Sequence, residues 1–346
     1  MSPIFWKQAL HPLEGMYIAL FGREHSDAER GHSVCPVWWL RDLTLIGLGL
    51  SDITPEYRGD LSLVEREGLT VLELQPELET WHARRLKGSY RLLAVHAASQ
   101  GRDIASPDAN HRSFAVKEAK RDMVFAHLVG ADSFLLHPGH ILSPSNIAGI
   151  VEEADYPFVS AYYWEHPERR CVRIQMFLES LSELAAFYEQ EGFRFEITLE
   201  NLPFPNLCAT TAELLSVYRL SRLRLPLKIT LDVPHLWVSF LLLRDNPWLR
   251  GLVEGYLDSA RAFYADLEGF VAANEDVVAY YHIYGTRGLE EHLPISLKRR
   301  YGTDELDLRR VARTIGDRRP IILEVFNVPQ SAVRRSISNF ERLLRE

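Results

Sequence analysis

The stretch LDVPHLW, residues 231–237, places an acid and an imidazole three residues apart at the end of the apolar run LKITL. Side chains alternate between the two faces of a strand, so Asp232 and His235 converge only if the chain leaves the strand after Asp232. Pro234 fits poorly in a central strand and well in such an exit. The motif therefore predicts one metal ligand at the tip of a strand and a second on the loop beyond it.

Other apolar runs end in the same kinds of residue. Each of six successive runs, from the third to the eighth along the chain, finishes in a side chain able to bind a metal. These strand-end residues are His96, His137, Glu200, Asp232, His282 and Glu324. A second local pair, Glu290 and His292, stands two residues apart, and an extended chain would place both on one side. Glu291 beside them is an equally acidic candidate.

The ligand chemistry is imidazole and carboxylate without thiolate. This set suits zinc, manganese or iron(II), and zinc is the first choice. A catalytic ion takes about three protein ligands and leaves a position open for water or substrate. The six strand-end residues together with His235, Glu290 and His292 exceed that number, so the sequence predicts two or three divalent metal ions.

Eight short apolar runs must position these residues. The runs are apolar on both faces, as parallel strands covered by helices are, and lie at 43–50, 69–75, 90–97, 132–139, 195–201, 227–233, 277–285 and 321–327. Between them, residues 112–130 and 172–190 show apolar positions at helical spacing. This alternation predicts an α/β fold, a (β/α)8 TIM barrel, whose active site forms at the carboxyl ends of the strands. A doubly wound open sheet is the alternative, but GLGLSD at 47–52 matches its glycine-rich phosphate turn poorly.

The composition is that of an ordinary folded protein, 47% hydrophobic and 25% charged over 346 residues. The net charge of −8 gives no overall basic field to attract nucleic acid. Three widely spaced cysteines and an N-terminus unlike a secretory signal lead us to expect a cytoplasmic location. No membrane partner is expected, because the apolar runs are too short to span a bilayer, and no obligate protein partner is indicated. We expect a single barrel domain at 43–346, preceded by an N-terminal extension at 1–42.

Several motifs resemble, in order, those of the xylose-isomerase-like TIM barrels and, among them, the endonuclease IV branch. They are HPG at 137–139, LEN at 199–201, LDVPH at 231–235, EEHLPI at 290–295 and LE at 323–324, with a further similar stretch at 103–121. The resemblance implies three metal sites. His96, His137 and Glu200 would hold one ion; Glu200, Asp232, His282 and Glu324 a second, with Glu200 bridging; and His235, Glu290 and His292 a third.

The chain also departs from that branch. The glycine-rich start typical of abasic-site endonucleases is missing after the first strand. Glu291 and Ser296 stand where those enzymes commonly have arginine and glycine. These departures argue against a role in DNA repair more than they argue against metal binding.

Two functions fit such a site. The surplus of ligands favours endonuclease IV-like hydrolysis of a phosphoester, in abasic DNA or a small phosphorylated substrate, because clustered ions activate water and stabilise both the attacking and the leaving oxygen. The alternative is isomerisation or epimerisation of a sugar or sugar phosphate, with one ion and two glutamates that move protons next to a carbonyl. An iron-dependent oxidative enzyme is a weaker third candidate. The catalytic candidates are Glu200, Glu324 and His235.

Two further residues are candidates for contact with the substrate. Arg287 follows the seventh run and could contact a phosphate or a hydroxyl group. Trp164 belongs to the long segment 138–170 after the fourth run. Long segments at the active face of a barrel are more often functional than structural.

Overall fold

The computed structural model describes residues 46–50, 71–74, 76, 91–97, 102–139, 167–222, 225–246, 249–250, 253, 255–297, 304–325 and 329–346. The predicted extension at 1–42 and the candidate substrate contact Trp164 lie outside the described residues. Both therefore stay predictions.

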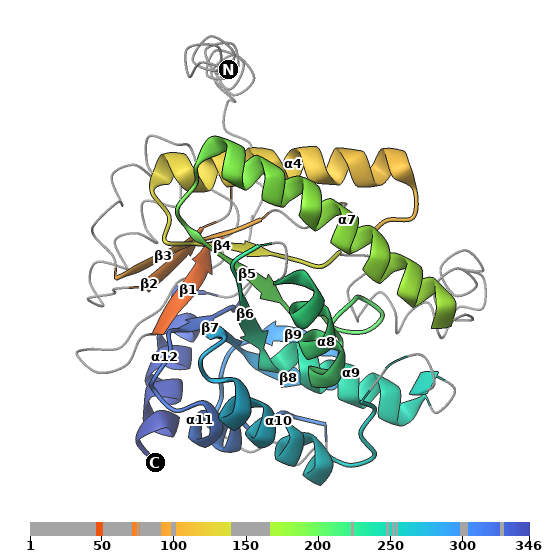
Figure 1. Ribbon diagram of the computed structural model, residues 1–346. Coiled ribbons are helices and arrows are strands. Elements are labelled where there is room, and N and C mark those ends of the chain that lie inside the picture. Colours follow the sequence, from red (N-terminus) through yellow and green to blue (C-terminus); the bar gives the residue numbers. More distant parts are fainter. Residues whose placement is uncertain are drawn as a thin grey trace, which may run out of the picture. The chain divides into compact units, whose positions relative to one another are not determined.

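Eight parallel strands form a closed barrel, and each of the eight predicted runs contains one of them (Figure 1). Round the barrel the order is β1, β2, β3, β4, β5, β6, β7, β10 and back to β1. The strands are β1 (Ile46–Leu50), β2 (Val71–Leu74), β3 (Leu92–His96), β4 (Ser133–Leu136), β5 (Glu196–Glu200), β6 (Leu227–Asp232), β7 (Val278–Ile283) and β10 (Ile321–Leu323). The predicted (β/α)8 barrel is confirmed, and an open sheet is excluded because β1 pairs with both β2 and β10.

From β3 onward, at least one helix separates each barrel strand from the next. They are α4 (Ala109–Val129), α7 (Pro167–Glu191), α8 (Thr211–Ser221), α9 (Val233–Asp245), α10 (Ala260–Asn274), α11 (Leu308–Ile315) and α12 (Gln330–Arg345). Asp108, Thr210 and Ser259 each accept a hydrogen bond from a backbone N–H in the first turn of α4, α8 and α10, which is the preferred chemistry at a helix start. Within the described parts of the chain, no helix is long and apolar enough to cross a membrane.

The start of α9 corrects the expectation of a loop after β6. Asp232 ends the strand and caps the helix, because its Oδ1 accepts a hydrogen bond of 2.6 Å from the N–H of His235. Pro234 stands in the first helical turn, where its missing N–H has no partner to lose. His235 therefore lies in the first turn of a helix, immediately beside the tip of β6.

A small hairpin follows β7 and lies at the carboxyl end of the barrel. It consists of β8 (Gly285–Arg287) and β9 (Glu290–Leu293), which pair antiparallel. Gly285 has no room for a side chain, because a Cβ there would lie 2.8 Å from the carbonyl oxygen of Pro294. The hairpin ends at the EEHLPI motif, and His292 adopts a left-handed backbone with φ of 57°.

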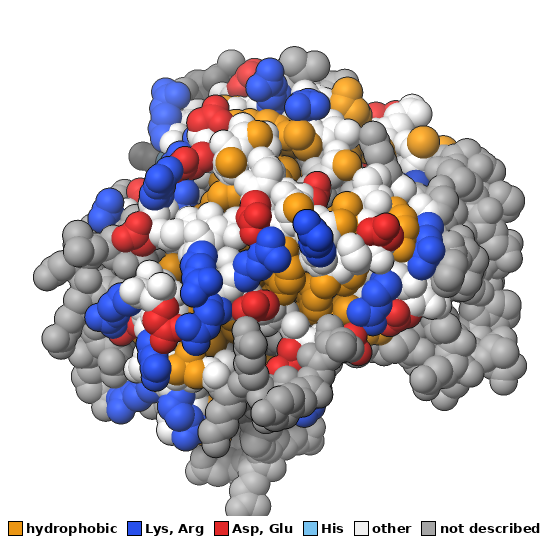
Figure 2. All heavy atoms as spheres, turned by 90° about the horizontal axis from the view of Figure 1, so that it is seen from below, with side chains coloured by type: hydrophobic (Ala, Val, Ile, Leu, Met, Phe, Trp, Pro, Cys, Tyr) orange, Lys and Arg blue, Asp and Glu red, His pale blue; other side chains and the backbone are white. Residues whose placement is uncertain are grey.

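The solvent-facing sides of the later helices carry charges of both signs. Ion pairs join Arg310 to Glu268 and Arg318 to Glu275, and one face of the molecule shows the same mixture of blue and red side chains (Figure 2). Exposed pairs of this kind contribute little stability each. In this view, the described surface has no large area that carries positive charge alone.

Candidate metal centre

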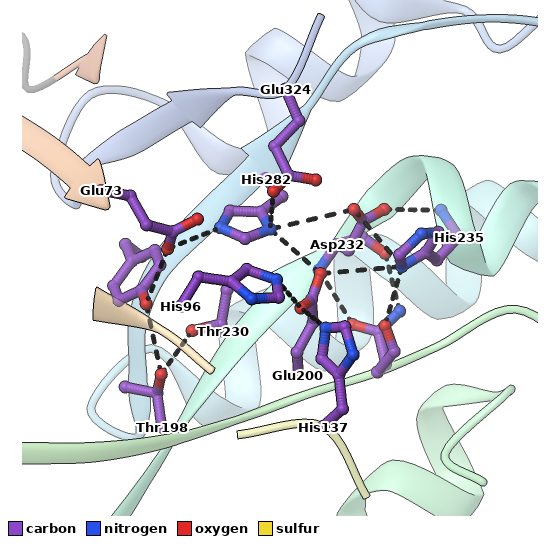
Figure 3. A network of polar contacts seen from close by, with 12 residues as sticks. Glu73, His96, His137, Thr198, Glu200, Thr230, Asp232, His235, His282 and Glu324 are labelled. Atoms are coloured by element: carbon purple, nitrogen blue, oxygen red, sulfur yellow. Dashed lines mark hydrogen bonds and ion pairs between the residues drawn. The ribbon is translucent and has the colours of Figure 1, made fainter. Parts of the chain in front are cut away.

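Two layers of side chains fill the inside of the barrel near its carboxyl end. Val71, Ala94, Leu135, Tyr280 and Ile322 form one buried cluster. Thr198 and Thr230 are the buried residues at the matching positions of β5 and β6. Residues two positions further along each of these strands point to the same side. They form a second, polar layer of Glu73, His96, His137, Glu200, Asp232, His282 and Glu324 (Figure 3). All six predicted strand-end residues belong to this polar layer.

Glu200, Asp232, His282 and Glu324, here called the inner tetrad, converge on one point. Nδ1 of His282 lies 3.0 Å from Glu200, 3.5 Å from Glu324 and 4.0 Å from Asp232. One ligand atom from each of the four residues lies within 4.8 Å of the others. Ligands about 2.1 Å from a common ion lie up to roughly 4.2 Å apart. Small movements of buried side chains would thus place all four around one ion.

Asp232 supplies an independent sign that a cation fits here. Its Oδ1 is engaged by the N–H of His235, but its Oδ2 is buried and has no hydrogen-bond partner. A buried carboxylate oxygen without a donor is costly. Asn201 fixes the position of this residue by exchanging two hydrogen bonds with its backbone, of 2.7 and 2.8 Å. The inner tetrad therefore fits a divalent metal ion, and Oδ2 of Asp232 would be one of its ligands.

Glu200 faces two groups at once. Its Oε2 lies 2.6 Å from Nε2 of His137 and 3.5 Å from Nε2 of His96, whereas its Oε1 faces His282 in the inner tetrad. His96, His137 and Glu200 also lie within ligand distance of one another. The predicted role of Glu200 as a bridge between two sites thus has the geometry it requires.

A third group, here called the outer cluster, consists of His235, Glu291 and His292. Nε2 of His235 lies 3.6 Å from Glu291, and the rings of the two histidines are 6.1 Å apart. Nδ1 of His235 lies 2.9 Å from the carbonyl oxygen of Asn201, so its N–H is used there and Nε2 stays available as a ligand.

The structure corrects one predicted ligand, Glu290. Its side chain is exposed and pairs with Arg287 across the hairpin turn, accepting a hydrogen bond of 2.8 Å from Nε. Glu291, the next residue, points the opposite way and takes the place in the outer cluster. The same pair holds Arg287 at an exposed position, so the structure does not bring this predicted substrate contact to the polar layer.

The inner tetrad concentrates charge in a buried space. Burial raises the pKa of Glu324 to about 7, although the charge of His282 opposes the rise. Burial would also raise the pKa of Glu200, but His282 and His137 outweigh it and hold this pKa well below the usual range. Burial would lower the pKa of His96, but its contact with Glu200 raises it to about 9.

In contrast to the inner tetrad, the outer cluster consists of groups that are neutral at neutral pH. Burial lowers the pKa of His235 and of His292 to about 3. Burial raises the pKa of Glu291 to about 8. The two imidazoles are therefore in the unprotonated state that a metal ion requires.

Glu73 belongs to the polar layer but not to the predicted site. It is fully buried near the end of β2, and with His96 and Glu324 it forms a further group within ligand distance. The sequence signal was the single acid inside the apolar run LTVLELQ. Seven barrel strands, not six, therefore contribute a residue to the polar layer.

The sequence of residues 82–343 matches the family model of the xylose isomerase-like TIM barrel. The chain belongs to that family, as its motifs and its closed barrel indicated. No curated protein sequence matches the chain.

Solved structures with the same fold are mostly described as sugar epimerases. They include 3-keto-D-glucoside 4-epimerase YcjR from E. coli (12% identity, TM-score 0.58, 88% of this chain and 100% of that one) and D-allulose 3-epimerase from Methylomonas sp. (16%, 0.56, 88% and 98%). Another is the TTHB071 protein from Thermus thermophilus, soaked with ZnCl2 (17%, 0.54, 86% and 97%). At such identities the likeness shows the fold alone.

Proposed function

We propose that the chain is a divalent-metal-dependent isomerase or epimerase of a sugar or a related polyhydroxylated carbonyl compound. One observation carries the proposal: two buried glutamates, Glu200 and Glu324, face Nδ1 of the same histidine at 3.0 and 3.5 Å, and their surroundings push their pKa values apart. Such a pair is the usual arrangement for a base and an acid that work together. The descriptions of the similar structures support this choice over phosphoester hydrolysis.

The chemistry requires a proton to leave a carbon next to a carbonyl and another to return. Glu200 and Glu324, which face the same histidine at 3.0 and 3.5 Å, are the carboxylates placed to take up this proton and to return it. A divalent ion bound by the inner tetrad would polarise the oxygens of the substrate. His235, neutral and with Nδ1 directed at Asn201, presents Nε2 as an acceptor for a hydroxyl group.

Exchange with solvent tests this proposal directly. The purified protein, loaded with manganese, cobalt or zinc, is incubated with a panel of ketoses and aldoses in D2O. We expect deuterium at the carbon next to the carbonyl, and a new isomer or epimer, detected by NMR. Glu200→Gln and Glu324→Gln should abolish the exchange, whereas Glu290→Gln, at an exposed site, should retain it. Absence of exchange with every sugar tested, in a protein that carries metal, would contradict the proposal.

Phosphoester hydrolysis is the second candidate, because one observation favours it. The His96–His137 pair and the outer cluster flank the inner tetrad, and one ion needs neither of them. Ions in adjacent sites would suit an in-line displacement at phosphorus. Cleavage of an abasic-site oligonucleotide, or release of phosphate from a small ester, by protein that catalyses no sugar exchange would make this candidate the better one.

A further inference from the structure

One carboxylate in the polar layer, Glu73, has no part in the proposed reaction. It is fully buried on β2, and its Oε2 lies 3.3 Å from Nε2 of His282 on β7. The two strands are not neighbours in the barrel, since β2 pairs with β1 and β3, and β7 with β6 and β10. The contact therefore crosses the inside of the barrel, as the close view shows (Figure 3).

The two ring nitrogens of His282 face different partners. Nδ1 faces Glu200 and Glu324, and Nε2 faces Glu73. To bind an ion through Nδ1, the ring must carry its proton on Nε2, where a second group has to accept it. Without such an acceptor the proton could sit on Nδ1 and donate to Glu200 at 3.0 Å, which blocks the ligand position.

We propose that Glu73 is a positioning residue for the metal ion of the inner tetrad. It accepts the Nε2–H of His282 and so fixes the tautomer and the ring orientation in which Nδ1 faces the ion. Histidine ligands of metals almost always have such a partner, and its loss weakens metal binding by roughly 10- to 100-fold.

A chain of hydroxyl groups holds Glu73 in this role. Tyr280 donates to Oε2 of Glu73 at 3.2 Å, lies 3.3 Å from Thr198, and Thr230 donates to Thr198 at 2.8 Å. Each hydroxyl has one hydrogen, so the donors must run from Thr230 through Thr198 and Tyr280 to the carboxylate. This chain of hydroxyl groups ends on Oε2 of Glu73, the same oxygen that faces Nε2 of His282.

The geometry favours positioning over direct ligation. Oε1 of Glu73 is buried without a hydrogen-bond partner, and His96 and Glu324 are within ligand distance. However, Nδ1 of His96 is engaged with the carbonyl oxygen of Ala97 at 2.8 Å, and its Nε2 already faces Glu200. An ion on Glu73 would have to take His96 away from Glu200.

The test compares two replacements of Glu73 that keep its length. Glu73→Met removes the acceptor, whereas Glu73→Gln keeps an oxygen but loses the charge. Zinc affinity is measured by competition with a chelator, and bound metal at saturation by elemental analysis. We expect affinity for the inner-tetrad ion to fall roughly 10- to 100-fold in Glu73→Met and by less in Glu73→Gln, with the number of bound ions unchanged. Glu196→Gln is the matched control, because Glu196 begins β5 at the end away from Glu200. This variant should bind zinc as the unmodified chain does.

A second readout follows the histidine itself. In the zinc-loaded, 15N-histidine-labelled protein, the Nε2–H of His282 should give a downfield, slowly exchanging NMR signal, identified by its absence in His282→Asn. In Glu73→Met the signal should move upfield and exchange faster. If Glu73→Met does not fold because Tyr280 loses its acceptor, the double variant Glu73→Met/Tyr280→Phe removes both partners and takes its place.

The proposal rests on metal binding by the inner tetrad, which the proposed function shares. Unmodified protein that binds no divalent metal would overturn both. Unmodified protein that binds metal, together with a Glu73→Met variant of equal affinity and unchanged His282 signal, would overturn only the positioning role. Loss of a whole ion at saturating zinc in that variant would also overturn it, because Glu73 would then be a ligand.

Discussion

The inner tetrad and the outer cluster use similar ligand types on different kinds of structure. The tetrad residues stand at the ends of four neighbouring strands, and none is more than 5% exposed. The outer cluster stands on the first turn of α9 and on β9, and Glu291 and His292 are partly exposed. The position of the tetrad is therefore set by the register of the barrel, whereas that of the outer cluster depends on a hairpin that can change without altering the barrel.

The two groups also differ in charge. Three carboxylates share the tetrad with one imidazole, and like charges that are buried together repel one another. The outer cluster has two imidazoles that burial keeps neutral. We therefore expect a divalent ion to bind more tightly at the tetrad than at the outer cluster. The number of ions bound outside the tetrad then decides between the two candidate reactions.

The largest effect is expected from Glu200→Gln, because Glu200 belongs to the tetrad and faces the His96–His137 pair as well. The variant should lose bound metal and at least about 10²-fold in turnover, the usual contribution of an acid–base group. Circular dichroism should show an unchanged fold, since glutamine keeps the volume. A variant with full metal content and full turnover would show that Glu200 is neither ligand nor base.

Anomalous scattering at the metal edge, from a crystal of the metal-loaded protein, tests whether the outer cluster binds an ion as the tetrad does. With the proposed isomerase we expect one peak at the tetrad, which leaves the outer cluster as a group of substrate contacts. A separate peak at His235 and His292 would favour phosphoester hydrolysis instead. In that case His292→Ala should remove only the second peak, because the tetrad does not depend on β9.

The barrel and most of the site could be predicted from the sequence, because both follow from short local patterns. Apolar runs fixed the eight strands, and the polar residue ending each run fixed the layer. Glu73 was missed because it stands alone inside its apolar run, without a neighbouring motif such as HPG or LDVPH. His235 was placed on a loop because Pro234 signals both a strand exit and a helix start. The choice between Glu290 and Glu291 depends on which face of β9 meets α9, and spacing alone does not contain that information.

Glu291→Gln is expected to have a smaller, selective effect. Burial raises the pKa of Glu291 to about 8, so in the absence of an ion the group is already protonated at neutral pH and glutamine mimics it closely. Folding should be unchanged, but an ion in the outer cluster needs the carboxylate and should bind roughly tenfold more weakly or worse. Metal titration followed by elemental analysis measures this affinity. If an ion in the outer cluster binds as tightly as in the unmodified chain, Glu291 is not one of its ligands.

The smallest effect is expected one residue earlier, which makes Glu290→Gln the sharpest control. Its carboxylate pairs with Arg287 at the exposed turn of the hairpin, and side chains of adjacent strand residues point to opposite faces. Exposed ion pairs contribute about 0.2–1 kcal/mol, so the free energy of unfolding should fall by no more than that. Metal content and turnover should equal those of the unmodified chain. If Glu290→Gln instead lost an ion while Glu291→Gln kept it, the hairpin in solution would present its other face to α9, and the ligand expected from the EEHLPI motif would be the right one.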